Sequence, residues 1–184
     1  DAKRAVSAAK NGKANVNVTN GKTIDEKALS SMAKTAAKDD VKLTVTAKTT
    51  DKDGAVIGSI KFDAAKAAEA VAKADNKEVK LGVEMNSRNT KNVEKLFDNW
   101  FKNKNTDVVK MAQKGEFGFD VEVAVKVNMK NFNKDTLKFY SYDVSTNTYK
   151  EINTKYTIDA KGLVHFNTTV GNYVIITDAP LTSK

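Results

Sequence analysis

Three tyrosines have the residue type and spacing to bind a sugar. Aromatic rings stack on the flat C–H faces of sugar rings, while polar side chains bond the hydroxyls. Tyr140 and Tyr142 alternate along a strand-like segment, so if Phe139 faces the core, both tyrosines face outward about 7 Å apart. Tyr149, across the next turn, would join this platform. The alternative interpretation is that the tyrosines pair across strands and stabilise the sheet.

A second candidate sugar site surrounds Trp100, the only tryptophan of the chain. Tryptophan can stack on sugars, but Trp100 and Phe97 belong to one apolar stripe of a predicted helix, which is typical of a core position. Phe101 widens that stripe, so one ring could stay exposed. Arg88, in the turn before this helix, could donate hydrogen bonds to hydroxyls beside Trp100, or it could be a surface charge.

Residues that commonly carry catalysis are scarce. The chain has no cysteine, and its single histidine, His165, lies in a strand-like run where an ordinary strand position is the favoured interpretation. Glu116, Asp120 and Glu122 share one face of a regular strand, whereas a glycosidase needs two carboxylates that face each other across a cleft. We therefore predict a protein without enzymatic activity and without a cofactor.

The segment Asp51-Lys52-Asp53-Gly54 resembles the start of a calcium loop, because hard cations need several oxygen ligands close together. The segment is too short, and the distant bidentate glutamate is missing. A hairpin turn predicts the same residues. We expect a turn here and no metal.

The net charge of +8 comes almost entirely from lysine, since Arg4 and Arg88 are the only arginines. Lysine lacks the bidentate fork with which arginine reads phosphates and bases, so the charge predicts a solvated surface and no nucleic-acid partner. The sequence contains no run of about 18 apolar residues, so we expect no membrane insertion. The polar beginning and end are typical of a module that is covalently linked to further domains in a longer secreted protein.

Hydrophobic periodicity predicts the elements that carry these residues. A capping box of Thr23 and Glu26 opens a helix that ends near Lys38, and Asp63 caps a second helix to about Ala74. A third helix is predicted at residues 92–104, and residues 1–13 form a short helix or an arm. The predicted strands are residues 15–19, 41–45, 55–62, 79–85, 117–129, 137–144, 148–158, 163–167 and 172–177.

These elements predict an α+β fold, mainly antiparallel, with a sandwich-like or curved sheet and about three helices packed on one side. We interpret residues 1–184 as a single module. A seam near residues 105–115 would separate a mixed helix and strand part, 14–104, from an all-β part, 116–178.

Four runs in the second part resemble a C-terminal pattern of secreted and surface proteins of clostridia and ruminococci, including cellulosome and amylosome systems. The runs are residues 119–123 (FDVEV), 137–143 (LKFYSYD), 162–166 (GLVHF) and 171–178 (GNYVIITD). The resemblance implies an extracellular, cell-surface accessory module, comparable to domains of starch-adherence and cellulose-adherence proteins.

The resemblance and the tyrosines together predict a non-catalytic module that binds a polysaccharide of the glucan, starch or cellulose type. The alternative is a structural, adhesion or protein-docking module of a surface complex, with no sugar ligand. Exposed aromatic rings would favour the first function, and buried rings the second.

Overall fold

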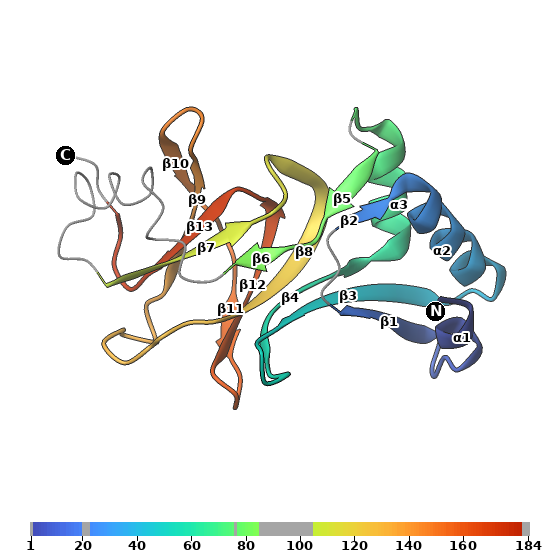
Figure 1. The fold of residues 1–184 in the computed structure, drawn as a ribbon, viewed down its shortest axis with the longest axis horizontal. Coiled ribbons are helices and arrows are strands. Elements are labelled where there is room, and N and C mark those ends of the chain that lie inside the picture. Colours follow the sequence, from blue (N-terminus) through green and yellow to red (C-terminus); the bar gives the residue numbers. More distant parts are fainter. Residues whose placement is uncertain (1, 20–22, 76, 85–104, 182–184) are drawn as a thin grey trace.

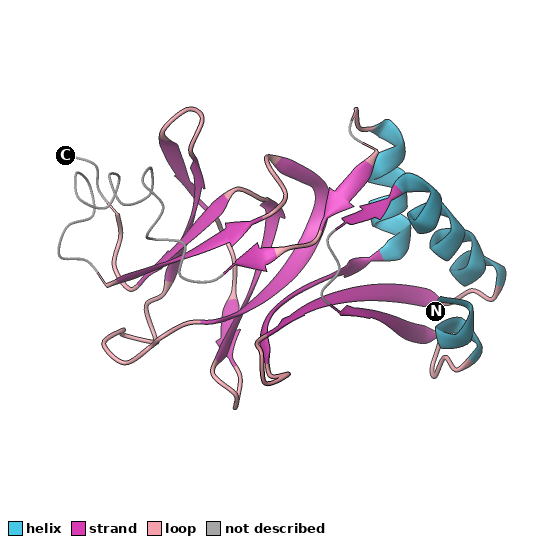
Figure 2. Ribbon diagram, viewed as in Figure 1, coloured by secondary structure: helices cyan, strands magenta, loops and turns pink. Residues whose placement is uncertain are grey.

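A computed structural model describes residues 2–19, 23–75, 77–84 and 105–181 (Figure 1). Its helices, α1 (Ala2–Ser7), α2 (Glu26–Lys38) and α3 (Ala64–Lys73), gather at one end, and strands form the rest (Figure 2). The predicted α+β class with mainly antiparallel strands is confirmed. None of these described helices is long and apolar enough to cross a membrane. The helix predicted at residues 92–104 lies outside the described residues.

The first sheet has six strands in the order β1-β3-β4-β8-β12-β11. β1 pairs with β3 in parallel, and the other neighbours are antiparallel. Because β4 pairs with β8, strands from both predicted parts of the chain share this sheet. The strands are β1 (Lys13–Thr19), β3 (Lys42–Thr50), β4 (Val56–Asp63), β8 (Glu116–Lys126), β12 (Leu163–Val170) and β11 (Tyr156–Ile158).

The second sheet has five antiparallel strands in the order β10-β9-β13-β7-β6. Its strand β7 occupies the segment where we predicted a seam. Within the described residues, β2 (Thr23–Asp25) and β5 (Glu78–Lys80) form a third, two-stranded antiparallel sheet. The second sheet consists of β10 (Thr148–Glu151), β9 (Lys138–Asp143), β13 (Tyr173–Thr177), β7 (Thr106–Met111) and β6 (Val83–Glu84).

Two segments that we predicted as single strands are each divided between two sheets. The segment 148–158 contains β10 in the second sheet and β11 in the first, and the segment 79–85 overlaps β5 and contains β6. Gly82 lies between β5 and β6, where its carbonyl accepts a hydrogen bond of 2.9 Å from the backbone N–H of Ala112. Alternation shows that a segment is extended, but it does not identify the neighbouring strand.

Aspartate side chains cap both long helices. Asp25 Oδ1 accepts the backbone N–H of Ala28 at 2.8 Å, and Asp63 Oδ1 accepts that of Lys66 at 3.0 Å. The predicted cap at Asp63 is confirmed. The predicted cap at Thr23 is wrong, because Thr23 belongs to β2 and the helix begins only after Asp25. Both helices thus start with a side-chain oxygen on an otherwise unpaired N–H.

One hydrophobic core connects the sheets and the helices. Phe139 of β9 stacks on Phe166 of β12 with ring centroids 4.7 Å apart, so the core passes from the second sheet to the first. Phe62 of β4 and Phe119 of β8 lie 5.3 Å apart beneath the helices' buried faces. Two parts of the sheets lie outside this core. They are the junction between the two sheets and the outer face of the second sheet, which is the face opposite Phe139.

Candidate functional site

The predicted tyrosine platform is not exposed. Tyr140 and Tyr142 lie on the face of β9 opposite Phe139, as the alternation predicted, but only 5% and 1% of their surfaces are exposed. The prediction that both face outward to a ligand is therefore wrong. A second hydrophobic cluster covers this outer face, formed by Tyr140, Tyr142, Val108, Ile175 and Leu181.

Hydrogen bonds hold these two tyrosines inside the second cluster. The backbone N–H of Leu181 donates to the Tyr140 hydroxyl at 3.1 Å, and the Tyr142 hydroxyl donates to Asn147 Oδ1 at 2.7 Å. Burial raises the pKa of Tyr142, and the nearby Asp143 raises it further. The alternative interpretation, in which the tyrosines stabilise the sheet, therefore fits Tyr140 and Tyr142.

Tyr149 lies at the edge of the same cluster and is half-buried. It is directly opposite Tyr142 in the sheet, and its ring meets the Tyr140 ring edge-on at 5.8 Å. Trp100 and Arg88, the other predicted binding residues, lie outside the described residues. Of the five predicted site residues, the structure brings the three tyrosines together as packing partners.

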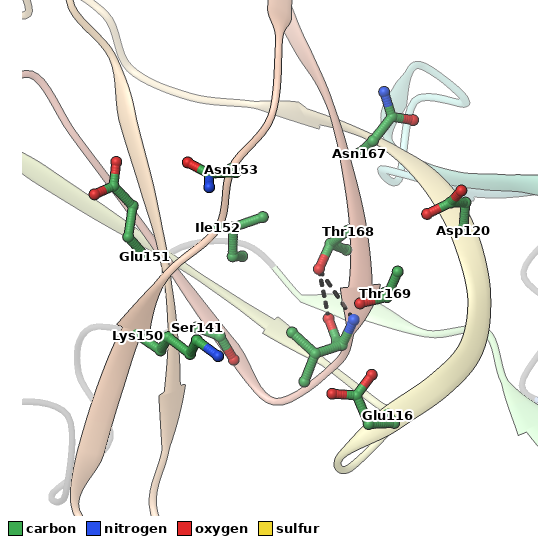
Figure 3. A pocket seen from close by; sticks show the side chains of 11 residues that line it. Glu116, Asp120, Ser141, Lys150, Glu151, Ile152, Asn153, Asn167, Thr168 and Thr169 are labelled. Atoms are coloured by element: carbon green, nitrogen blue, oxygen red, sulfur yellow. Dashed lines mark hydrogen bonds between the residues drawn. The ribbon is translucent and has the colours of Figure 1, made fainter.

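A polar groove of about 270 Å³ lies at the junction of the two sheets (Figure 3). Glu116 and Asp120 of β8 line one side, and Glu151 of β10 lies across from them. The Thr168 hydroxyl is already bonded to the backbone of Val170, at 3.0 Å to its carbonyl. None of the 11 lining residues is aromatic, so the groove offers hydrogen bonds without a stacking surface.

His165 lies in β12 but is not among the residues that line this groove. Its Nε2 is 2.8 Å from Asp159 Oδ2 in the turn that leads into the strand. Asp159 also accepts backbone N–H groups from Lys161 and Leu163 at 2.9 and 3.0 Å. The aspartate therefore holds both the hairpin turn and the imidazole, and the strand position predicted for His165 is confirmed.

Stability should depend on the ionisation of Asp159. The hydrogen bond from His165, followed by that from Leu163, lowers the pKa of Asp159. Its stabilising contribution is therefore present above the ordinary aspartate pKa of about 3.9 and is lost as the pH falls through the lower folded value. We expect Asp159→Asn to be less stable than the wild type at neutral pH, with a difference that shrinks in strong acid. Urea unfolding over a pH series measures this, and a difference that stays constant throughout would contradict it.

The segment Asp51–Gly54 is a hairpin turn, as predicted. Asp51 Oδ1 accepts the backbone N–H groups of Asp53 and Ala55 at 2.9 and 3.0 Å, and the Gly54 N–H donates to the Asp51 carbonyl. The carboxylate thus binds the turn's own backbone. Among the residues that the structure describes, no group of three or more histidine, aspartate or glutamate side chains is arranged to hold a metal ion.

A second pocket, of about 420 Å³, lies beside Tyr173 and is called the Tyr173 pocket below. Its walls are the end of β7, the turn after β9 and the start of β13. The half-buried Tyr173 and Val144 side chains both pack on the second cluster, and Lys110 and Asp143 are among the polar lining residues. An apolar pocket with a few convergent polar groups is the usual form of a small-ligand site.

The Tyr173 pocket lies at one end of a row of side chains across the second sheet. Tyr173 is directly opposite Tyr142 on one neighbour strand and Lys110 on the other. Side chains opposite each other in an antiparallel pair have Cβ atoms about 5 Å apart. The Tyr142 ring, whose centroid is 6.3 Å from that of Tyr173, therefore holds the pocket's aromatic wall in place.

A clasp of backbone hydrogen bonds fixes the frame of this pocket. The N–H groups of Gly171 and Asn172 donate to the carbonyls of Gly115 and Gln113 at 2.7 and 2.8 Å. Asn172 Oδ1 accepts the Gly115 N–H at 3.0 Å. Asn172 has a φ of 69°, a left-handed conformation that asparagine tolerates better than most residues. The clasp holds the start of β13 against the end of β7.

The sequence reasoning did not single out the residues of the Tyr173 pocket. Tyr173 stood only within the run at residues 171–178, and Lys110 and Lys114 stood within the predicted seam. The Gly171-Asn172 turn before an apolar strand was the available local signal. The pairing of β13 with β7, across more than 60 residues of chain, is what brings the lysine beside the tyrosine.

Comparison of the sequence with protein-family models and with curated proteins finds no match. The resemblance drawn from the strand runs therefore stays a prediction. The function has to be argued from the site geometry.

Proposed function

We propose that the chain is a non-catalytic polysaccharide-binding module of a secreted, cell-surface bacterial protein. The observation that carries the proposal is the Tyr173 pocket, where the half-buried Tyr173 ring and Val144 adjoin lysine and carboxylate groups. A sugar offers the matching pair of surfaces, an apolar C–H face and a rim of hydroxyls. The resemblance of the strand runs to surface-protein modules supports the extracellular location.

Binding in this pocket needs no covalent chemistry. The ring of Tyr173 would stack on a pyranose, and hydroxyls would bond the polar groups at the rim. The fixed clasp at Gly171 and Asn172 favours affinity, because a preformed site loses little conformational freedom on binding. The site thus replaces the platform first predicted at Tyr140 and Tyr142, while the proposed class of function stays the same.

Affinity electrophoresis tests the proposal. We expect retardation in a gel that contains a soluble polysaccharide, drawn from a panel of starch, xyloglucan, cellulose derivatives and acidic plant polysaccharides. Tyr173→Ala should abolish the retardation. Tyr149→Ala is the matched control, because Tyr149 is also half-buried on this sheet face but does not line the pocket. Migration unchanged in every gel would overturn the proposal.

A structural, adhesion or docking module without a sugar ligand is the second candidate function. Burial of Tyr140 and Tyr142 favours it, because these rings contribute to the fold instead of offering a surface. This function predicts that substitutions of all four clustered tyrosines change stability alone. Retardation lost only in Tyr173→Ala, with a loss of stability no larger than that of Tyr149→Ala, would exclude it.

A further inference from the structure

We infer that the Tyr173 pocket takes an acidic sugar, a pyranose ring that carries a carboxylate, as in polysaccharides of uronic acids. The inference rests on the proposed function and narrows its ligand class. It departs from the neutral glucan that the sequence favoured. The inference rests on the lining of the pocket, in which two lysines, Lys110 and Lys114, lie with the ring of Tyr173.

Lys110 and Lys114 supply the positive charge. Both side chains are exposed and both line the pocket. Within the described part of the chain, neither ammonium group forms an ion pair with a carboxylate. Glu84 lies opposite Lys110 on β6, but it is not among the residues that line the pocket. Two ammonium groups are therefore available to a carboxylate on the ligand.

Asp143, the carboxylate of this pocket, is already engaged. Its Oδ1 accepts the hydroxyl and the backbone N–H of Ser145 at 2.6 and 2.9 Å. These bonds, led by the one from the Ser145 hydroxyl, lower the pKa of Asp143 and keep it ionised at neutral pH. The pocket is lined by two lysines and this one carboxylate, so it keeps an excess of positive over negative side chains.

The arrangement of these groups matches a sugar acid better than other anions. Lys110 lies directly opposite Tyr173, so its ammonium group reaches the rim of the same ring that a pyranose would cover. A simple phosphate would leave the ring and Val144 without a partner. A neutral glucan would offer the two ammonium groups hydroxyl oxygens but no opposite charge.

Affinity electrophoresis in polygalacturonate, in its fully methyl-esterified form and in xyloglucan tests the inference. We expect the acid to retard the protein most strongly, and the ester and xyloglucan less. Lys110→Gln and Lys114→Gln should each weaken binding to the acid about two- to five-fold, as exposed ion pairs do. Lys126→Gln, which removes an equal charge at the far end of β8, should leave binding unchanged.

Each other outcome has a definite meaning. Equal weakening in Lys126→Gln would show diffuse attraction of a polyanion to a basic chain, and would overturn the inference. Equal retardation by acid and ester, still lost in Tyr173→Ala, would overturn the acidic class while leaving the proposed function intact. No retardation in any gel would overturn both. The lysine variants change exposed side chains, so a loss of binding in them does not arise from unfolding.

Discussion

Gly171→Ala should lower the free energy of unfolding by about 2–4 kcal/mol, because the site has no room for a methyl group. A Cβ at this position would lie 2.1 Å from the carbonyl oxygen of Gln113 and 2.8 Å from its carbonyl carbon. Backbone atoms cannot yield as a flexible side chain does. The start of β13 would have to move, and the bonds from Gly171 to Gly115 and from Asn172 to Gln113 would be strained or lost.

Urea unfolding of Gly171→Ala and Gly162→Ala measures this effect. Gly162 is the matched control, because its φ is 83° but nothing lies within 4 Å of the added Cβ. Its substitution therefore carries only the cost of a left-handed backbone, about 1–2 kcal/mol. An effect at Gly171 that is no larger than the effect at Gly162 would contradict the steric explanation. Because the clasp frames the Tyr173 pocket, Gly171→Ala should also weaken retardation by the polysaccharide.

Tyr142→Ala should lower the free energy of unfolding by about 3–5 kcal/mol, the usual cost of removing a buried aromatic ring. Its ring is 1% exposed and contacts Tyr173, and Ile175 belongs to the same cluster. Tyr142→Phe keeps the ring and removes only the hydroxyl bond to Asn147, so it should cost about 1 kcal/mol. Equilibrium unfolding of both variants separates packing from hydrogen bonding.

Tyr149→Ala provides the comparison for the second cluster. Its ring is half-buried, so its removal should cost less than that of Tyr142. An exposed platform would give a different result, with little loss of stability from either substitution and loss of sugar binding from both. A stability loss in Tyr142→Ala that is no larger than that in Tyr149→Ala would contradict the assignment of Tyr142 to a core.

The second cluster links the stability of the sheet to the proposed site. Tyr142 contacts Tyr173, and Tyr173 forms a wall of the pocket, so packing inside the cluster determines where the exposed ring edge lies. Substitutions of Tyr142 are therefore expected to reduce binding indirectly. Only changes at Tyr173, Lys110 and Lys114 test ligand contacts directly.

Local features of the fold could be predicted from the sequence because short-range interactions determine them. The Asp63 cap depends on one side chain and an N–H group three residues away. The hairpin turn at Asp51 likewise closes within five residues. Alternation placed Tyr140 and Tyr142 on the face opposite Phe139, since successive side chains in any strand point to opposite faces.

The tertiary structure alone decided what covers each face. Alternation assigns a side chain to a face of its strand, but burial depends on segments that are distant in sequence. The backbone N–H of Leu181 bonds the hydroxyl of Tyr140, which lies 41 residues earlier in the sequence. This contact helps to bury a tyrosine that we predicted as part of an exposed binding platform. The pairing of β13 with β7 places Lys110 beside Tyr173 and creates the pocket on which the proposed function depends. The sequence by itself determined the extended segments, the Asp63 cap and the Asp51 turn, because these depend on neighbours within a few residues. The Thr23 cap, the division of two strands between sheets and the site depended on contacts between distant segments that no local pattern specifies.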